Sequence, residues 1–333
     1  MNCCTRCVLP ETFPGITFDQ DGVCNYCRNN PVPDAEGKKA LLAKFEALIE
    51  GKRSQGPFDV ILAYSGGKDS TYTLSLLRER FGLKVLAFVF DNGFISGQSM
   101  ENIRLMTDTL GAACFIFRPP FPVMKKAFAL AAGSDIYSPK TLDRASSICT
   151  TCIGMVKAMV LKTALAYGIP LAAFGWSPGQ APLSSAIMQT GPRLQRFSDK
   201  SVRDPLVKLA GPEVEPYFLT GDDLAKDPSR WPVNVHPLAF MDYDEDDIVR
   251  KIGELGWVKP VDTDPNSTNC LLNALANHLH RERFHFHPYA WEIAGIVRSG
   301  CMDRAQGLEK VSQEEDREMV NYAARLLGIG LGR

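Results

Sequence analysis

The sequence predicts an α/β fold, in which a parallel, doubly wound sheet follows an N-terminal cysteine ribbon and precedes a helical C-terminal region. Short apolar runs alternate with helical patterns between residues 58 and 174, which is typical of parallel sheets covered by helices on both faces. Five of the ten cysteines lie within the first 27 residues. From residue 244 onward, helical periodicity dominates.

The overall composition narrows the function. The chain has 333 residues, 45% hydrophobic residues and a net charge of -1, which excludes a disordered chain. The balanced charge disfavours binding to nucleic acid mainly through phosphates, so a small-molecule acceptor is favoured over tRNA. The N-terminus lacks a secretory signal, and lysines interrupt the apolar stretch 157–176. We therefore expect a cytoplasmic protein without a membrane span.

The N-terminal cysteines form two Cys-x-x-Cys pairs, Cys4 with Cys7 and Cys24 with Cys27, separated by sixteen residues. Four thiolates complete a closed tetrahedral site around one ion, so the spacing predicts a structural zinc ribbon. An iron site and free thiols remain alternatives at this stage. The adjacent Cys3 could also take the place of Cys4.

The clearest sign of a phosphate site comes after the apolar run 58–64. This run leads directly into Ser65, Gly66, Gly67, Lys68, Asp69 and Ser70, and then into a helical pattern. Glycines let backbone N–H groups approach phosphate oxygens, and a helix N-terminus favours negative charge. The motif is not a Walker A loop, because Leu62 stands where that motif needs glycine and Asp69 where it needs serine or threonine.

The same six residues closely resemble the PP-loop of the N-type ATP pyrophosphatase superfamily. The resemblance implies a Rossmann-like fold and an ATP site. In that family the loop holds the pyrophosphate end of ATP and leaves the α-phosphate open to attack by a substrate oxygen. By this resemblance Ser65 to Ser70 contact the ATP phosphates and Mg²⁺. Lys68 balances phosphate charge, and Asp69 links to the metal.

Other loops are expected to meet the PP-loop at the carboxyl ends of the strands. Asp91 ends a predicted strand and could contact the ribose or adenine, although a plain turn carboxylate is an equal alternative. Gly175 opens the loop 175–180. This loop stands where many superfamily members carry a Gly-His-x-x-Asp-Asp-like segment, but the histidine and the acidic pair are absent here.

A second group of cysteines points to chemistry. Cys149 and Cys152 begin a predicted helix, and Cys270 opens another. This trio resembles the tRNA thiolation branch of the superfamily, in which three cysteines bind a 4Fe-4S cluster whose fourth iron stays open to carry sulfide. Catalytic or persulfide-carrying cysteines, and buried structural thiols, are the alternatives.

A further resemblance covers most of the chain. The opening residues 4–27, the surroundings of Cys152 and Cys270, and the tail 296–311 are similar to the N-acetyl sugar amidotransferases. These are PP-loop enzymes that use ammonia from a separate glutaminase. Cys149 departs from that pattern and favours sulfur over nitrogen as the nucleophile.

Together these features predict an adenylating transferase that activates a carbonyl-type oxygen with ATP. Sulfur delivered at Cys149, Cys152 and Cys270 then replaces AMP, with ammonia as the alternative nucleophile and a non-catalytic nucleotide-binding protein as a third interpretation. A sulfur donor or a glutaminase is the expected partner. A homodimer is compatible with the sequence.

The predicted organisation has five segments. They are a zinc ribbon over 1–30, a linking helix over 31–56 that packs the ribbon onto the next domain, the PP-loop domain over 57–190, a loop or insertion over 191–235, and a helical region over 236–333 that completes the active site. We expect Cys114 to lie in the core and Cys301 to have no special role. The histidines between 278 and 287 are expected to pack or bind substrate rather than a metal.

Overall fold

The computed structural model describes residues 2–30 and 35–331. Its centre is a six-stranded sheet of order β3-β2-β1-β4-β6-β5, in which only the β5–β6 pair is antiparallel. The predicted α/β class with a mostly parallel sheet is therefore confirmed. The strands are β1 (Val60–Ala63), β2 (Val85–Phe90), β3 (Ala113–Phe117), β4 (Leu171–Phe174), β5 (Ile187–Gln189) and β6 (Val233–Val235).

The strand order reverses between β1 and β4, and this reversal positions the site. The chain passes from β1 outward through β2 to β3, and then returns to place β4 on the other side of β1. Loops that follow neighbouring strands at such a point diverge and leave a crevice outside the carboxyl ends. The segment 64–67 follows β1 and the segment 175–180 follows β4, so both border this crevice.

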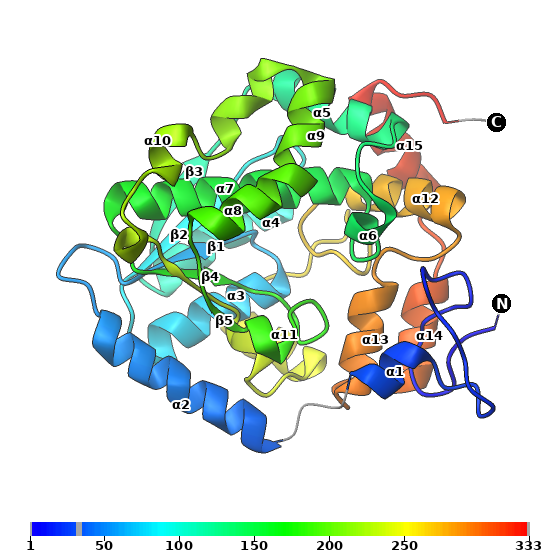
Figure 1. The fold of residues 1–333 in the computed structure, drawn as a ribbon, viewed down its shortest axis with the longest axis horizontal. Helices are drawn as coiled ribbons and strands as arrows, with labels where there is room; N and C mark the ends of the chain where they lie inside the picture. The colour runs from blue at the N-terminus through cyan, green and yellow to red at the C-terminus, as the bar shows by residue number, and fades with distance from the viewer. Residues whose placement is uncertain (1, 31–34, 332–333) are drawn as a thin grey trace.

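Helices cover both faces of the sheet, because alternate strand residues point to opposite sides. Ile61 packs into one core, whereas Val60 and Leu62 pack into the other. The first core contains α5 (Phe121–Gly133), α7 (Ser147–Tyr167), α12 (Asn273–Phe284) and α15 (Arg317–Leu327). The second contains α2 (Ala35–Lys52), α3 (Lys68–Ser75), α4 (Gly97–Thr109) and α11 (Glu245–Glu254) (Figure 1).

The remaining helices have at most ten residues each. They are α1 (Asn25–Asn29), α6 (Pro139–Leu142), α8 (Pro192–Ser201), α9 (Arg203–Ala210), α10 (Gly221–Leu224), α13 (Ala290–Arg298) and α14 (Arg304–Ser312). A π-helical turn, Leu76–Arg80, continues α3. Short 3-10 turns lie at Leu183–Ser185, Pro212–Tyr217, Pro228–Arg230 and Pro237–Ala239.

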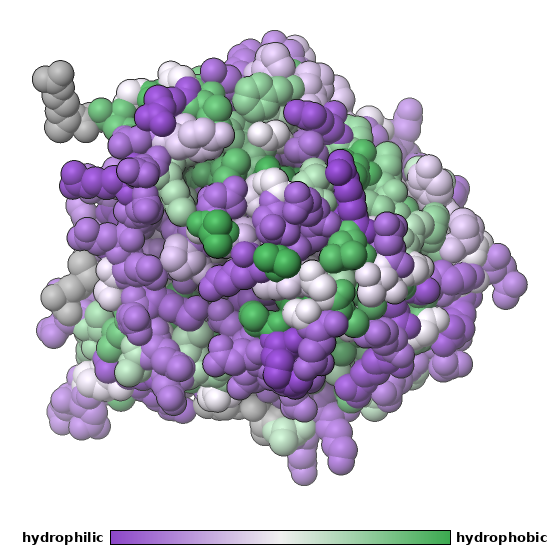
Figure 2. Space-filling view, turned by 180° about the vertical axis from the view of Figure 1, so that it is seen from behind, coloured by the Kyte–Doolittle hydropathy of each residue, from purple (hydrophilic) through white to green (hydrophobic). Residues whose placement is uncertain are grey.

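Helix α7 is long and apolar enough to cross a membrane by length and composition. However, 56% of its most apolar window is buried inside the protein, where it packs against β1, β4, α5 and α12. Its composition is therefore explained by its place in the core. On the face opposite to that of Figure 1, hydrophilic residues predominate and hydrophobic ones are scattered among them (Figure 2).

One expectation from the sequence, the place of Cys114, is wrong at this level. The segment 191–235, expected to be a loop or an insertion, forms α8, α9 and α10 with 3-10 turns between and after them. Helices α8 and α9 bury two residues each, so they leave little apolar periodicity in the sequence. Cys114, expected in the core, is exposed. It lies on the edge strand β3, where Phe115 and Ile116 are also exposed.

The cysteine ribbon docks on the C-terminal helices and not through the helix that comes after it in the chain. Phe13 stacks on Trp291 of α13 with ring centroids 5.8 Å apart, and Arg304 of α14 donates hydrogen bonds to the carbonyl oxygens of Cys4 and Cys7. Helix α2 instead buries Phe45 against the sheet core. Residues 31–34 of the predicted linking helix lie outside the described residues.

Candidate active site

The motif 65–70 forms a tight turn between β1 and α3, and the first turn of α3 begins at Lys68. Gly66 has φ +75°, and a Cβ there would lie 2.6 Å from the carbonyl oxygen of Ser99. Glycine is therefore required both by the backbone conformation and by the close approach. The hydroxyl groups of Ser65 and Ser70 are 3.0 Å apart, so two hydroxyls and a helix N-terminus meet at this turn.

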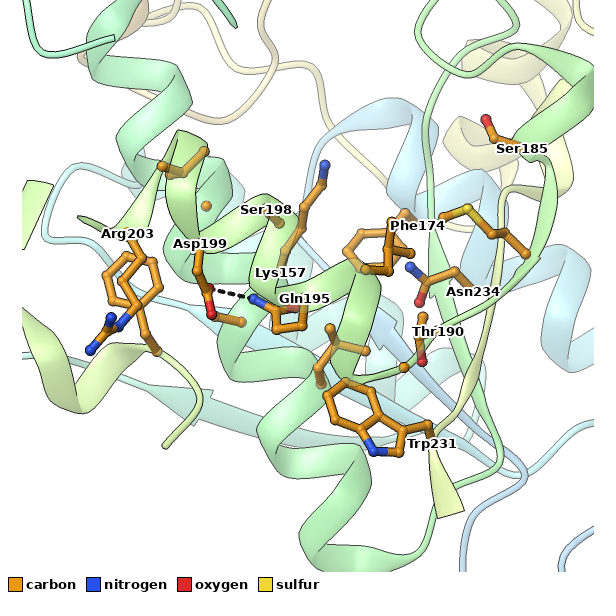
Figure 3. Close-up of a pocket in the computed structure, with 18 of the residues that line it drawn as sticks. Lys157, Phe174, Ser185, Thr190, Gln195, Ser198, Asp199, Arg203, Trp231 and Asn234 are labelled. Atoms are coloured by element: carbon orange, nitrogen blue, oxygen red, sulfur yellow. Dashed lines mark hydrogen bonds between the residues drawn. The ribbon is translucent and has the colours of Figure 1, made fainter. Parts of the chain in front are cut away.

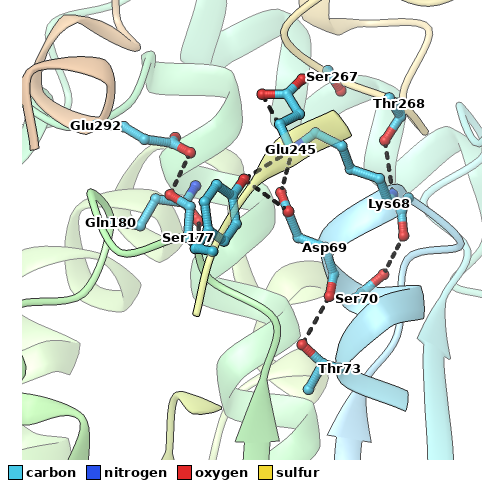
Figure 4. Close-up of polar contacts among 12 residues, drawn as sticks. Lys68, Asp69, Ser70, Thr73, Ser177, Gln180, Glu245, Ser267, Thr268 and Glu292 are labelled. Atoms are coloured by element: carbon cyan, nitrogen blue, oxygen red, sulfur yellow. Dashed lines mark hydrogen bonds and ion pairs between the residues drawn. The ribbon is translucent and has the colours of Figure 1, made fainter. Parts of the chain in front are cut away.

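Lys68 is held in a charged network (Figure 4). Its Nζ donates hydrogen bonds to Asp69 Oδ2 at 2.8 Å and to the Tyr243 hydroxyl at 3.2 Å, and Glu245 lies 4.0 Å away. The Tyr243 hydroxyl in turn donates to Asp69 Oδ1 at 3.0 Å. Burial lowers the pKa of Lys68, but Asp69, Tyr243 and Glu245 outweigh burial and raise that pKa well above its usual value. Lys68 therefore remains a cation.

A segment from the C-terminal part of the chain completes the turn. The Thr268 hydroxyl accepts a hydrogen bond from the Lys68 backbone N–H at 3.0 Å, and the Thr268 carbonyl accepts one from the Ser99 hydroxyl. Cys270 pairs with Ile95 in an isolated antiparallel bridge. Thr268 was not predicted from the sequence, although it lies two residues before the predicted Cys270.

The loop after β4 lies close to the start of α3, and Gly175 permits this. A Cβ on Gly175 would lie 2.6 Å from the Ser70 Cα, so a larger residue would push β4 away from the turn. At the other end of the loop, a Cβ on Gly179 would lie 1.9 Å from the Glu292 carbonyl oxygen. The loop is thus fixed between the 65–70 turn and α13.

A cavity of about 210 Å³ opens beside the turn, at the carboxyl ends of β1, β2 and β4. We call it the turn-side cavity. Besides apolar side chains, its lining contains polar groups, one lysine and two cysteines from several elements. These residues include Ser65, Ser70, Asn92, Cys152, Lys157, Gly175, Trp176, Asn269 and Cys270.

A second cavity, of about 190 Å³, gathers the three predicted cysteines, and we call it the cysteine cavity. Cys149 and Cys152 lie in the first turns of α7, where the Ser146 side chain caps the Cys149 backbone N–H, and Cys270 faces them from the bridge to Ile95. Cys152, Cys270 and Asn92 also line the turn-side cavity. Cys152 and Cys270 therefore stand between the two cavities, whereas Cys149 lines the cysteine cavity alone.

Hydrogen bonds and burial determine the protonation of these three thiols. The Asn92 amide donates to Cys152 Sγ at 3.3 Å and the Asn273 amide to Cys149 Sγ at 3.8 Å. Burial raises the pKa of Cys152 and of Cys270 to about 12 and also raises that of Cys149. Binding iron would have to displace their protons.

The trio is spaced more widely than the N-terminal cysteines. In the described part of the chain, the four N-terminal cysteines are the group whose ligand atoms all lie within 4.8 Å of one another, and the trio does not meet that limit. In an iron–sulfur cluster each thiolate binds a different iron, so the sulfur atoms stand farther apart than around one ion. The three cysteines of the trio are partly buried and line one cavity.

Glu292 of α13 also lines the cysteine cavity. Its Oε1 accepts a hydrogen bond from the Ser177 hydroxyl at 2.7 Å. Burial raises the pKa of Glu292 to about 7; the Asp69 carboxylate raises it further, while Ser177 and Lys68 oppose the shift. Glu292 can therefore exchange a proton near neutral pH.

The four N-terminal cysteines form a compact, buried group that could hold a metal ion. Cys4 Sγ lies 3.8 Å from Cys27 Sγ, and Cys7 Sγ lies 3.8 Å from Cys24 Sγ. Zn–S bonds of about 2.3 Å in a tetrahedron require sulfur–sulfur edges of about 3.8 Å, so the group has the size of a Cys₄ zinc site.

Backbone hydrogen bonds prepare one of these thiols to bind a metal. The N–H groups of Arg6, Cys7 and Cys24 donate to Cys4 Sγ at 3.2–3.4 Å. Burial raises the pKa of Cys4, but these hydrogen bonds bring it down to about 7. Cys3 is not part of the group.

Asp91 and His280 line neither of these two cavities and make other contacts. Asp91 accepts a hydrogen bond from the Gly93 backbone N–H and pairs with Arg118, as a turn carboxylate does. Its neighbour Asn92, which sequence reasoning missed, lines both cavities. His280 packs against Phe284 and Phe286, in line with a packing role.

Known proteins similar to this chain include one curated protein and one solved structure. No family model matches the chain. An uncharacterized protein, MJ1599, from Methanocaldococcus jannaschii is 22% identical over 320 residues, which are 95% of this chain and 94% of that protein. The U34-tRNA thiolase NcsA from Methanococcus maripaludis, solved with its 4Fe-4S cluster, aligns with a TM-score of 0.37 at 16% identity. That alignment covers 98% of this chain and 89% of the thiolase chain. Neither similarity is high enough to assign the chain to a family.

Proposed function

We propose that the protein is an ATP-dependent sulfurtransferase that adenylates a carbonyl-type oxygen and then replaces AMP with sulfur. The observation that carries the proposal is the wall shared by the two cavities, because Cys152 and Cys270 border both. An acceptor activated beside the 65–70 turn would lie next to the cysteines without having to leave the site. Such proximity is a large part of catalysis in two-step transfers.

In this proposal the turn binds the phosphates of ATP. The backbone at the N-terminus of α3 and the hydroxyls of Ser65 and Ser70 receive the β- and γ-phosphates, and Lys68 balances their charge. The carboxylate of Asp69 is the candidate ligand for Mg²⁺, because oxygen ligands suit this ion. The acceptor oxygen attacks the α-phosphorus, and the bond to pyrophosphate breaks. AMP then leaves as the sulfur nucleophile forms its bond to carbon.

The cysteine trio would hold a 4Fe-4S cluster through Cys149, Cys152 and Cys270. When bound, such a cluster supplies an iron site without a protein thiolate, at which exogenous sulfide can be carried. The chain itself contributes the orientation of the thiols through Asn92 and Asn273. It also contributes Glu292, which can accept a proton from the incoming nucleophile.

We propose that the ribbon binds Zn²⁺ through Cys4, Cys7, Cys24 and Cys27 as a structural ion. Its four thiols form a closed buried group, so no position is open for substrate. The ribbon contacts α13, the helix that carries Glu292. By stabilising the ribbon, the ion would also stabilise α13, which forms part of the wall of the cysteine cavity.

An amidotransferase that uses ammonia from a separate glutaminase is the second candidate. One observation favours it. The two stretches that resemble N-acetyl sugar amidotransferases, the ribbon and the tail 296–311, contact each other through the hydrogen bonds from Arg304 to Cys4 and Cys7. In that case the acceptor would be adenylated in the same way, and ammonia would attack in place of sulfide.

The experiment measures pyrophosphate release from ATP under anaerobic conditions. Two acceptor fractions, a small-molecule cell extract and total tRNA, are each combined with sulfide or with ammonium. We expect release over many turnovers with the small-molecule fraction and sulfide, and Lys68→Ala should abolish it. Cys270→Ala should limit release to the first turnover, because it blocks sulfur transfer and not adenylation. Release that depends on ammonium and survives Cys149→Ala would favour the amidotransferase. Absence of release from every combination would contradict an adenylating enzyme.

A further inference from the structure

Tyr243 contacts both charged side chains of the 65–70 turn, although it lies 174 positions after Asp69 in the chain. Its hydroxyl donates a hydrogen bond to Asp69 Oδ1 at 3.0 Å and accepts one from Lys68 Nζ at 3.2 Å. The Lys68 ammonium also lies 5.8 Å from the centre of the Tyr243 ring. A single phenol therefore links the two residues that would meet the phosphates and the metal ion.

The surroundings of Tyr243 fix the position of its ring. The side chain is 6% exposed and packs in the second core with Phe240 and Met241. The next residue, Asp244, caps α11 by accepting a hydrogen bond from the Asp247 backbone N–H at 2.8 Å, and α11 packs against α3. The phenol is therefore held at a fixed place relative to the turn.

The two oxygens of the Asp69 carboxylate have different partners. Oδ1 accepts a hydrogen bond from the Tyr243 hydroxyl, whereas Oδ2 accepts one from the Lys68 ammonium at 2.8 Å. Within the described ranges 2–30 and 35–331, these are the two hydrogen bonds that the carboxylate accepts. Oδ2 thus already faces a cation, and a carboxylate oxygen is a ligand that suits Mg²⁺.

Lys68 can leave Asp69 without leaving another charge unbalanced. Its Nζ also lies 4.0 Å from Glu245 Oε2, but Lys310 pairs with Glu245 at 3.3 Å. Lys310 therefore still balances the charge of Glu245 when Lys68 turns towards phosphate. The departure of Lys68 frees Oδ2 and leaves the Tyr243 hydroxyl as the remaining hydrogen-bond donor to the carboxylate.

We infer that Tyr243 is a positioning residue for Mg²⁺, which holds Oδ1 of Asp69 and so presents Oδ2 to the ion. Carboxylates that bind metals are themselves hydrogen-bonded, and loss of such a partner typically weakens metal binding by about 10–100-fold. The inference rests on the part of the proposed function in which the turn binds ATP with Mg²⁺. It is the same whether sulfide or ammonia is the nucleophile.

The test compares the wild type with Tyr243→Phe, which removes the hydroxyl and keeps the ring. The affinity of the full chain for α,β-methylene-ATP, whose bridge between the α- and β-phosphorus resists cleavage, is measured by calorimetry in EDTA and in excess Mg²⁺. We expect Mg²⁺ to raise the affinity of the wild type. In Tyr243→Phe this increase should be about tenfold smaller. The affinity in EDTA should not change, because the phosphates still meet Lys68 and the backbone of the turn.

Two variants control for the loss of a buried hydrogen bond. Tyr137→Phe removes a phenol hydroxyl that bonds to the Thr151 hydroxyl at 2.7 Å. Gln195→Met removes an amide that donates to Asp199 Oδ1 at 2.7 Å, a bond between two residues of α8 (Figure 3). Neither bond involves a residue of the turn, so both variants should keep the full increase with Mg²⁺.

Three results would overturn the inference, and each can be recognised. An equal increase with Mg²⁺ in the wild type and in Tyr243→Phe would leave the ATP site in place but remove the role of Tyr243. A loss of affinity in EDTA as large as the loss in Mg²⁺ would show general damage to the turn instead of a role toward the ion. If the wild type binds the analogue in neither condition, the proposed ATP site fails, and the inference fails with it.

Discussion

At the scale of single residues, the site depends on glycines that let backbones approach and on groups whose pKa is shifted. Gly66, Gly175 and Gly179 each stand where a Cβ would meet backbone atoms. The motif 65–70 predicted the need for Gly66. The motif did not predict the need for glycine at position 179. That need arises because Gly179 lies against α13, which is more than 100 residues away in the sequence. Contacts of this kind depend on the tertiary fold and leave no local pattern.

Gly66→Ala tests the turn. The new Cβ would press on the Ser99 carbonyl and force an L residue into the left-handed region, which costs about 1–3 kcal/mol. We expect reduced stability in urea unfolding and weaker binding of a non-hydrolysable ATP analogue. Gly97→Ala is the control, because a Cβ at Gly97 meets nothing within 4 Å. Unchanged analogue affinity in Gly66→Ala would argue against a phosphate site at this turn.

Glu292 gives a pH dependence with a defined sign. Its pKa is raised from 4.5 in the unfolded chain to about 7 in the folded protein, so the folded state binds more protons between these values. Stability from this group is complete below pH 4.5 and is lost as pH rises through 7. The free energy of unfolding of the wild type, relative to Glu292→Gln, should therefore fall over that range.

The measurement is urea unfolding of both proteins at pH 4.5, 6 and 8. The exposed Glu282→Gln serves as the control for changes in net charge. If the free energy of unfolding differs between wild type and Glu292→Gln by the same amount from pH 4.5 to 8, the Glu292 pKa is not raised.

At the scale of elements, helix α13 connects the two cysteine groups. It presents Trp291 to the ribbon, through stacking on Phe13, and Glu292 to the cysteine cavity. The sequence predicted both cysteine groups and the helices of the C-terminal region. It did not predict this contact, because the ribbon was expected to pack through the helix next to it in the chain. Docking partners are set by complementary surfaces and not by adjacency in sequence.

Arg304→Ala tests the attachment of the ribbon to α14. The guanidinium donates to two carbonyl oxygens of the ribbon, and hydrogen bonds from a charged group contribute about 1.5–3 kcal/mol. We expect a loss of about 2 kcal/mol in the free energy of unfolding and faster release of the ribbon's metal to a chelator. Arg317→Ala, exposed at the start of α15, is the matched control. If the ribbon's metal is released to the chelator at the same rate in the two variants, Arg304 has no role in holding the ribbon.

At the scale of the whole molecule, distant segments converge at the carboxyl edge of the sheet. The alternation of strands and helices predicted the parallel sheet and placed the 65–70 turn at that edge. From the region after residue 236, Tyr243 and Thr268 contact Lys68 of the turn, and Cys270 lines the turn-side cavity. Helices α8 and α9 could not be predicted, because they bury two residues each and so leave little hydrophobic pattern.

Metal analysis of the protein, purified and reconstituted with iron and sulfide without oxygen, decides whether the cysteine trio holds a cluster. We predict about four irons for each chain, with a brown colour, together with one zinc. Cys149→Ala should lose the iron and the colour but keep the zinc, and Cys114→Ala, at an exposed cysteine on β3, should keep both. A colourless protein that contains zinc alone after reconstitution would contradict the proposed sulfurtransferase.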